Sequence, residues 1–345
     1  MIIRICAFTE KGNKLAERIA GILPDDIVEI RTWEDTDVFV ARTFEIRCPL
    51  IFIGAMGIAV RKIAAFVDDK LTDSPVIVID EKGENVIPML SGHMGGANRI
   101  AADLANRLGA RAVITTATDV EGKFAVDVFA RDNHLGIVNR DGIRVVSEKV
   151  LAGKAITIWD RDRCCITHTG ADGKTSIIDN NVWSSGTSDK EIFGKVDVII
   201  SESRESDHMA SLALYPKRLY VGIGCKKGTP YYRIEDEVSR VLRDNSIDYK
   251  EIALIASIDL KAKEYGLNEY ASRHNLELKT FSADMLKMAA GEYTPSEFVK
   301  DVTGVDNVCE RAAVMAAGED SELLVRKSAA GGVTVAVAVR KCRAI

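Results

Sequence analysis

No run of apolar residues in the sequence approaches the roughly 20 that a membrane-spanning helix needs, so we predict no transmembrane segment. The first residues, Met1 to Phe8, are apolar but lack a basic leader and a small-residue cleavage site, so we expect a β-strand there and no signal peptide. Neither sign of charge dominates: 46 lysines and arginines face 51 aspartates and glutamates, a net charge of −5. This balance excludes a general attraction to nucleic acid or anionic membranes, although local basic clusters could still bind an anionic small molecule.

Cysteine and histidine are few and scattered, with seven and five residues respectively. No CxxC pair or Cys/His cluster has the spacing of a zinc site, so we predict no metal centre. The odd number of cysteines, several of them inside strand-like runs, indicates reduced thiols in a cytoplasmic protein. The cysteines are Cys6, Cys48, Cys164, Cys165, Cys225, Cys309 and Cys342. Four histidines have no motif around them and are interpreted as surface or structural residues: His134, His168, His208 and His274.

Apolar runs alternate with amphipathic stretches at both ends of the 345-residue chain, 47% of which is hydrophobic. This alternation is typical of parallel sheets covered by helices on both faces. The predicted fold class is therefore α/β, with two open, mostly parallel-sheet domains linked by a smaller α/β middle region. We place the domains at residues 1–129, 130–216 and 217–345. A Gly331-Gly332 turn predicts that the last two strands form an antiparallel hairpin.

The first glycine-rich segment, Gly54-Ala55-Met56-Gly57, follows a short apolar strand and precedes Arg61-Lys62. In an open parallel sheet, ligands bind beyond the carboxyl ends of the strands. Glycines there let backbone N–H groups face a ligand, and the two basic side chains would lie within reach of an anion. A plain β–α turn with two solvated basic side chains explains the segment equally well.

A second segment, Ser91-Gly92-His93-Met94-Gly95-Gly96-Ala97-Asn98, also lies between a strand and a helix. Backbone N–H groups at a helix N-terminus could hold a carboxylate or a developing oxyanion. A histidine beside them can act as a general base or acid near neutral pH. A structural loop with an exposed histidine is the alternative.

The third segment, Thr115-Thr116-Ala117-Thr118-Asp119, follows the next predicted strand. A carboxylate in such a crevice could orient His93 or take a proton. A turn stabilised by Ser, Thr or Asp side chains is the alternative interpretation.

The C-terminal part contains Gly222-Ile223-Gly224-Cys225-Lys226-Lys227-Gly228 after a predicted strand. The glycine spacing is a weak match to a dinucleotide fingerprint, but the segment is a plausible anion-binding nest with two lysines. Ser257 and Lys261 would follow the neighbouring strand at the same edge. Cys225 has no histidine nearby in the sequence, so its role as a nucleophile is unsupported.

Long runs through these segments resemble the CbiG family, the cobalt-precorrin-5A hydrolases of the anaerobic cobalamin pathway. The runs are residues 54–64, 75–81, 90–98 and 112–119. Residues 222–228, 256–261 and 334–338 are similar to CobE, a separate protein of the aerobic pathway. The resemblance covers both ends of the chain, whereas the middle matches only in position and approximate length.

The resemblance implies that the substrate is a cobalt-containing, ring-contracted tetrapyrrole that carries a δ-lactone. The family opens this lactone and releases acetaldehyde, which gives cobalt-precorrin-5B. The macrocycle itself would accept the electrons of the broken carbon–carbon bond, so we expect no separate cofactor, and the cobalt is part of the substrate. The partner is thus the cobalt-corrinoid substrate; other enzymes of the pathway and a second copy of the chain are further candidates.

Residue roles are our own hypotheses from the sequence. We assign the base role to His93, an orienting or second acid–base role to Asp119, and oxyanion stabilisation to the N–H groups of Gly95 and Gly96. A cleft between the two α/β domains would hold the macrocycle. The residues expected to bind substrate are Gly54, Gly57, Arg61, Lys62, Ser91, Gly92, Gly95, Gly96, Asn98, Thr115, Thr116, Gly222, Gly224, Cys225, Lys226, Lys227, Ser257 and Lys261.

Two other functions remain open from the sequence. A non-catalytic carrier of tetrapyrrole intermediates would use the same anion-binding segments without needing His93 or Asp119. A nucleotide-dependent oxidoreductase is suggested by the glycine loops, but the spacing from Gly222 to Gly228 argues against it.

Overall fold

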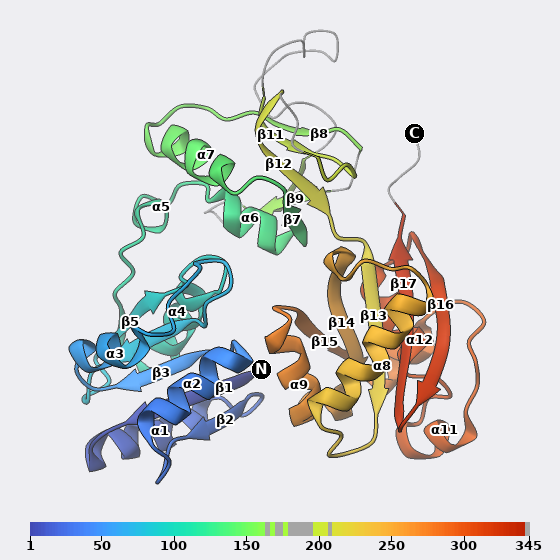
Figure 1. Cartoon of the computed structure of the whole chain (residues 1–345), viewed down its shortest axis with the longest axis horizontal. Helices are drawn as coiled ribbons and strands as arrows, with labels where there is room; N and C mark the ends of the chain where they lie inside the picture. The colour runs from blue at the N-terminus through green and yellow to red at the C-terminus, as the bar shows by residue number, and fades with distance from the viewer. Residues whose placement is uncertain (163–165, 170–174, 179–195, 206–208, 342–345) are drawn as a thin grey trace.

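The computed structural model describes residues 1–162, 166–169, 175–178, 196–205 and 209–341. Three sheets follow one another along the chain, and a separate two-stranded ribbon accompanies the middle one (Figure 1). The protein is therefore a mixed α/β protein with mostly parallel sheets, as predicted. In the part of the chain that is described, no helix has the length and apolar character needed to cross a membrane.

The N-terminal sheet has six strands in the order β2-β1-β3-β4-β5-β6. The first four strands in this order run parallel, but β5 is antiparallel to β4, to which it is joined by a tight turn at Gly83. The last strand, β6, is parallel to β5. The carboxyl ends of β5 and β6 therefore lie at the edge where β1, β3 and β4 begin. The strands are β1 (Ile2–Ala7), β2 (Ile27–Ile30), β3 (Leu50–Ile53), β4 (Val76–Ile79), β5 (Asn85–Leu90) and β6 (Arg111–Ala112).

Four helices cover the two faces of this sheet. Strands β1, β3 and β4 are fully buried, which explains their continuous apolar sequences. One core contains residues of α1 and α4, such as Ile19 and Leu104, and the other contains residues of α2 and α3, such as Phe39 and Ile63. The helices are α1 (Glu10–Ile22), α2 (Thr36–Ile46), α3 (Met56–Ile63) and α4 (Ala97–Leu108).

The middle sheet has four strands in the order β7-β12-β11-β8, with β7 antiparallel to β12. Three residues of α6, Val126, Phe129 and Ala130, pack in the core of this sheet, although the sequence suggested a boundary after Phe129. The strands are β7 (Leu135–Ile137), β8 (Ile158–Asp160), β11 (Val196–Ile200) and β12 (Ala210–Pro216). The helices are α5 (Ala117–Val120), α6 (Val126–Asp132) and α7 (Asp141–Leu151), and the ribbon consists of β9 (Ile166–Thr169) and β10 (Thr175–Ile178).

The C-terminal sheet has five strands in the order β15-β14-β13-β17-β16. The hairpin predicted at Gly331-Gly332 is confirmed, because β16 and β17 pair antiparallel around it. A short 3-10 turn, Asp259–Lys261, precedes α9 (Tyr265–Arg273). The strands are β13 (Leu219–Cys225), β14 (Ile252–Ile258), β15 (Glu277–Phe281), β16 (Ser321–Ala330) and β17 (Val333–Arg340). The other helices are α8 (Tyr231–Asp244), α10 (Ala283–Met288), α11 (Glu297–Thr303) and α12 (Cys309–Ala317).

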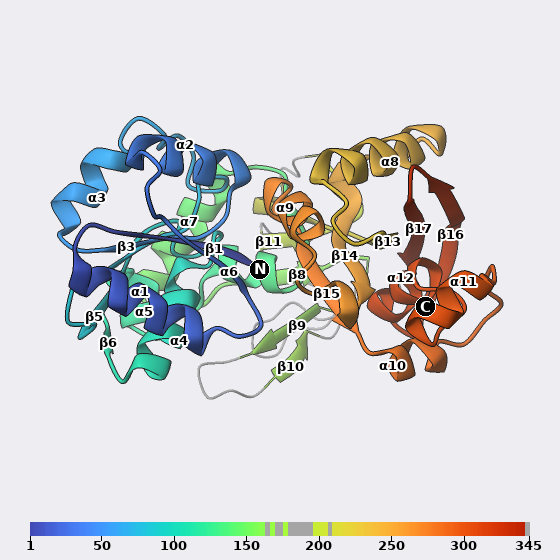
Figure 2. The same cartoon turned by 90° about the horizontal axis from the view of Figure 1, so that it is seen from below.

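Helix α9 joins the C-terminal sheet to the N-terminal one, as the view from below shows (Figure 2). Tyr265 packs against a small buried cluster that contains Ile2 and Ile46. Arg273 forms ion pairs with Glu269 of its own helix at 2.9 Å and with Glu45 of α2 at 3.0 Å. The edge of the N-terminal sheet where β1 begins therefore faces the C-terminal domain.

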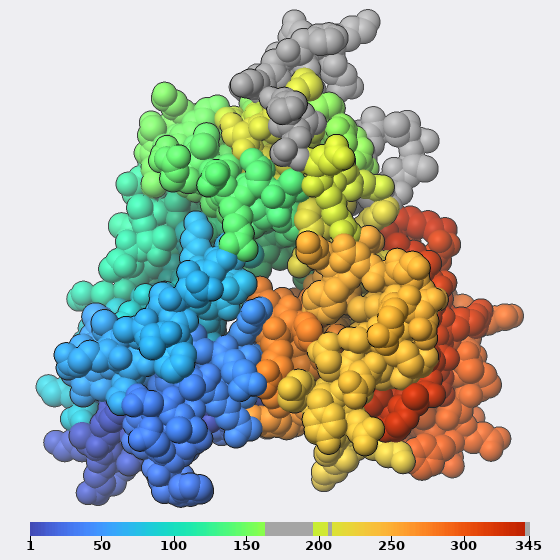
Figure 3. All heavy atoms as spheres, viewed as in Figure 1, coloured from blue at the N-terminus to red at the C-terminus, as the bar shows by residue number. Residues whose placement is uncertain are grey.

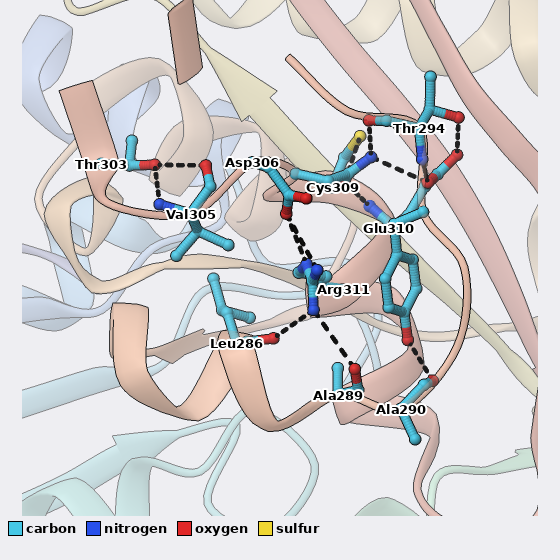
Figure 4. A network of polar contacts seen from close by, with 12 residues as sticks. Leu286, Ala289, Ala290, Thr294, Thr303, Val305, Asp306, Cys309, Glu310 and Arg311 are labelled. Atoms are coloured by element: carbon cyan, nitrogen blue, oxygen red, sulfur yellow. Dashed lines mark hydrogen bonds and ion pairs between the residues drawn. The ribbon is translucent and has the colours of Figure 1, made fainter. Parts of the chain in front are cut away.

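A buried carboxylate, Glu310, fixes the long segment between α10 and α12 (Figure 4). Its oxygens accept hydrogen bonds from the backbone N–H and the hydroxyl of Thr294 at 2.7 and 2.9 Å, from the Asn307 amide at 2.8 Å and from the backbone N–H of Lys327 at 2.7 Å. Four donors satisfy this carboxylate, so its role is structural.

The close packing of α12 on β13 leads to a prediction about Gly222. A Cβ atom at this position would lie 1.8 Å from the carbonyl oxygen of Cys309, which belongs to the helix backbone and cannot rotate away. We expect Gly222→Ala to lower the free energy of unfolding by about 3 kcal/mol.

Gly21→Ala is the matched control, because a Cβ atom there meets nothing within 4 Å. Alanine should leave stability unchanged or raise it by about 0.5 kcal/mol at this helical position. Urea unfolding followed by circular dichroism measures both variants, and equal stabilities would contradict the predicted clash.

Candidate functional site

The loop after β5 adopts a compact turn that only small residues allow. A Cβ atom on Gly95 would lie 2.6 Å from the Cβ atom of Ser91, and one on Gly92 would lie 2.6 Å from the Oδ1 atom of Asn98. Ser91 itself has a positive φ of 55°, and its hydroxyl donates to the carbonyl of Asp73 at 3.0 Å. The glycines thus meet a packing requirement that positions the one histidine of the loop.

His93 lies between two carboxylates. Its Nε2 atom is 2.8 Å from Oδ2 of Asp119, and its Nδ1 atom is 3.1 Å from Oδ2 of Asp127. The side chains of His93 and Asp127 are 16% and 13% exposed, whereas that of Asp119 is 37% exposed. Asp127 is therefore the internal partner of the ring, and Asp119 is the partner that a ligand could reach.

The two carboxylates stabilise the protonated imidazolium. The hydrogen bond and charge of Asp127 raise the pKa of His93 most, those of Asp119 add to this effect, and burial opposes it. The same interaction lowers the pKa of Asp127 although burial acts in the opposite direction. Both ring nitrogens face carboxylates, an arrangement that favours the protonated ring, and the base role inferred for His93 from the sequence stays a prediction.

Neighbouring polar side chains hold Asp119 in place. The amide of Asn98 donates to Asp119 at 2.8 Å and to the hydroxyl of Thr116 at 3.0 Å. The hydroxyl of Thr118 lies 3.3 Å from Nε2 of His93. The structure thus brings together the second and third segments that the sequence singled out, although Thr115 is exposed and has no role in these contacts.

Helix α6 supplies two residues that the sequence reasoning missed. Asp127 binds the His93 ring, and the guanidinium of Arg131 donates a hydrogen bond to the His93 carbonyl. Both lie in an ordinary amphipathic helix about 35 residues away, where no glycine or histidine motif marks them. Their spacing of four residues places them on one helical face, which is the only local signal.

The loop amides do not form the predicted oxyanion site at Gly96. The N–H of Gly96 donates to the His93 carbonyl at 3.1 Å, and those of Ala97 and Asn98 donate to Ser91 and Gly92 at 3.1 Å each. These amides are used to close the turn. The structure gives no comparable bond to the N–H of Gly95 in the described residues, so Gly95 stays a candidate.

The first glycine-rich segment lies at the opposite edge of the sheet from His93. Gly54 follows β3, whose last residue pairs with Ile79, whereas Ser91 follows β5, whose last residue pairs with Val76. The four residues of β4 separate the two loops by at least about 13 Å. The two loops lie at opposite edges of the sheet because β5 runs antiparallel to β4. Gly57, Arg61 and Lys62 therefore do not join the His93 site, and Lys62 pairs with Asp37 at 2.7 Å.

The Gly222–Gly228 segment does not reach His93 either. Strand β13 starts beside the middle sheet and carries its carboxyl end away from it over roughly 20 Å (Figure 1). The N–H of Gly228 already donates to Glu264 at 2.7 Å, and Lys261 pairs with the same carboxylate at 2.8 Å. The predicted anion nest is thus occupied by Glu264 of the chain itself.

Other members of this C-terminal set have packing roles. Gly222 faces helix α12, Gly224 faces the hydroxyl of Thr334, and the buried hydroxyl of Ser257 donates to the carbonyl of Ile223 at 2.7 Å. Lys226 lies against the Gly332 turn, and Lys227 is exposed. These contacts explain the residues without a ligand.

The thiols are reduced and unsuited to catalysis where the structure describes them. Cys6, Cys48, Cys225 and Cys309 are free, whereas Cys164, Cys165 and Cys342 lie outside the described residues. Burial raises the pKa of Cys225 to about 11, which disfavours the thiolate. Within the described ranges no group of three His, Cys, Asp or Glu side chains could hold a metal ion.

A hollow lies at the centre of the molecule. The space-filling view shows this hollow between the N-terminal part, the middle part and the C-terminal part (Figure 3). Helix α6 lies in the middle part, on its side toward the first and third sheets (Figure 1). A ligand of several rings could therefore contact all three parts at once.

Comparison with known proteins assigns this chain to a family. The Cobalamin synthesis G N-terminal profile matches residues 38–119, and the Cobalamin synthesis G C-terminus profile matches residues 219–338. The chain is 32% identical to the cobalt-precorrin-5A hydrolase of Salmonella typhimurium, covering 98% of this chain and 97% of that protein. The chain belongs to the cobalamin synthesis G family. It is a hydrolase of cobalamin biosynthesis.

Two further relatives agree with this cobalamin synthesis G assignment. The cobalt-precorrin-5A hydrolase of Priestia megaterium is 33% identical, with coverage of 97% of this chain and 94% of that protein. Protein CobE of a Sinorhizobium species is 30% identical over 38% of this chain and 86% of its own length. The C-terminal part of this family member is thus CobE-like, as the sequence indicated.

The ion pairs of His93 predict a pH-dependent contribution to stability. Because the folded pKa of His93 lies above its ordinary value of 6.5, this contribution is complete below about pH 6.5 and is lost as the pH rises through the folded value. We expect His93→Gln to lower the free energy of unfolding by roughly 2 kcal/mol at pH 6, the worth of a charge-assisted hydrogen bond.

Urea unfolding of wild type and variant over a rising pH series tests this expectation. The difference between them should shrink toward alkaline pH. A difference that stays constant across the series would show that His93 is not held as an imidazolium.

Proposed function

We propose that this chain is a cobalt-precorrin-5A hydrolase, which opens the substrate δ-lactone and releases acetaldehyde to give cobalt-precorrin-5B. The similarity to hydrolases of that name over nearly the whole chain carries this proposal. The Asp119–His93–Asp127 arrangement supports it, because lactone opening needs an acid, a base and a partner for the oxyanion. The reaction would take place in the cytoplasm, in keeping with the four free thiols described above.

We assign the acid role to His93 and the base role to Asp119. Asp127 keeps the imidazolium charged and fixes the ring, so that Nε2 can turn its proton from Asp119 to the lactone when substrate binds. Asp119 would then accept a proton from the attacking water. The partly exposed position of Asp119 suits this contact, whereas the buried Asp127 suits an orienting role.

The proposed steps balance as the addition of one water. Water adds to the lactone carbonyl, His93 stabilises the oxyanion and protonates the leaving oxygen, and a carboxylate and a hydroxyl group result. His93, now neutral, takes back the hydroxyl proton as the adjacent carbon–carbon bond breaks and acetaldehyde forms. The electron pair enters the conjugated macrocycle, which takes up the proton that Asp119 accepted from water, so the steps need no separate cofactor.

Substitution of the three residues tests the assignment. We expect His93→Gln and Asp119→Asn each to lower kcat for acetaldehyde release by about 10²–10⁴-fold, the usual worth of acid–base catalysis. Asp127→Asn should lower kcat less and shift the pH profile, because it acts through His93. His274→Gln is the control, because His274 pairs with Glu235 of α8 and neither residue contacts His93. This variant should retain the wild-type rate.

The pH profile separates the acid role from the base role. If His93 donates a proton, kcat/KM falls as the pH rises through its pKa, which lies above 6.5. If His93 is the base, the rate falls on the acidic side instead. A wild-type chain that binds the corrinoid tightly without releasing acetaldehyde would favour the carrier function over catalysis.

A further inference from the structure

A cluster of charged residues lies where the middle sheet meets the C-terminal sheet. His134, with a positive φ of 52°, follows α6, and its carbonyl accepts a hydrogen bond from the N–H of Lys217 at 3.0 Å. The pairing of Leu135 with Pro216 holds these two residues side by side. Lys217 therefore lies at the start of β13, beside the middle sheet and not at the distant Gly222–Gly228 edge.

Positive charge is in excess around His134. Lys217, Lys279 and Arg340 all act electrostatically on the ring, and Glu277 is the one carboxylate among the groups that do so in the described residues. Burial, together with these three cations, lowers the pKa of His134. Burial also lowers the pKa of Lys217. Burial and the nearby cations thus both disfavour the protonated form of the His134 ring.

The two lysines differ from the arginine in their partners. Arg340 donates to the carbonyl of Ala317 at 2.7 Å and lies over the ring of Tyr220. Across the described ranges, by contrast, neither Lys217 nor Lys279 forms an ion pair with a carboxylate, and Lys279 rests 5.5 Å from the centre of the Phe281 ring. A half-buried ammonium group without a counter-ion is unfavourable, so a carboxylate supplied by a ligand would stabilise Lys217.

Helix α6 connects this cluster to the catalytic site. Asp127 at its first turn binds the ring of His93, and His134 follows its last turn. Five residues of helical rise, about 8 Å, separate Asp127 from the end of the helix at Asp132, two residues before His134. Strand β15, which carries Lys279, forms the edge of the C-terminal sheet toward the central hollow (Figures 1 and 2). A macrocycle with carboxylate arms could bridge this distance.

We infer that Lys217 and Lys279 bind carboxylate arms of the corrinoid substrate while its lactone lies at His93. This inference rests on the proposed function. The acetate and propionate arms of a tetrapyrrole are the carboxylates that such lysines recognise. Lys226 and Lys227, which the sequence suggested for this role, follow the opposite end of β13 from Lys217. Lys279 lies level with Gly222, in the middle of that strand.

Steady-state assays of Lys217→Met and Lys279→Met test the inference. We expect each change to raise KM for cobalt-precorrin-5A about 10- to 100-fold, the loss of one charge-assisted contact, with kcat within about twofold of wild type. Lys217→Arg should keep part of the affinity because it keeps the charge. Lys287→Met is the matched control, since Lys287 is an exposed residue of α10 paired with Asp284, and its KM should not change.

Two results would overturn the inference: a KM that stays at the wild-type value in both lysine variants, or a fall in kcat with no change in KM. Titration of the corrinoid's absorbance with each protein, without turnover, separates this outcome from failure of the proposed function. If wild type binds but releases no acetaldehyde, the catalytic proposal fails, while weaker binding by the lysine variants still supports the carboxylate site. Equal binding by wild type and variants refutes the carboxylate site whatever the activity.

Discussion

The arrangement of two carboxylates around one imidazole ring connects parts of the protein that have separate hydrophobic cores. Asp119 follows the last strand of the N-terminal sheet, whereas Asp127 belongs to a helix whose apolar side chains pack in the middle core. The contacts of His93 with these two carboxylates therefore join the two parts. Arg131 strengthens this junction from the same helix, because it binds the carbonyl of His93.

The antiparallel strand β5 decides which loops can cooperate. Had β5 run parallel to β4, the loop of His93 would lie beside Gly54 and Arg61 at a conventional ligand-binding edge. The tight turn after Asp80 reverses the chain instead and moves the loop to the edge that faces the middle and C-terminal parts. A site at this edge can be shared among three parts of the chain, which suits a wide substrate better than a crevice in one sheet does.

Much of the fold could be predicted from the sequence, because apolar periodicity and glycine turns are local signals. The Gly331-Gly332 hairpin is found as predicted. The direction of β5 was not predictable in this way, since an apolar strand has the same sequence pattern in either orientation. The sequence brought His93, Asn98 and Asp119 into one hypothesis through their motifs. It missed Asp127, whose position depends on the packing of α6, and it overvalued Gly222 and Ser257, which serve packing and internal hydrogen bonds.

Helix α6 has one further consequence. It carries a ligand of the imidazole ring, yet its position is set by Val126 and Phe129 in the middle core. A shift of the middle core by a few ångströms would move Asp127 away from the His93 ring. This would remove the interaction that raises the pKa of His93 most. The pKa of His93 therefore depends on how the middle core holds α6 against the loop that follows β5.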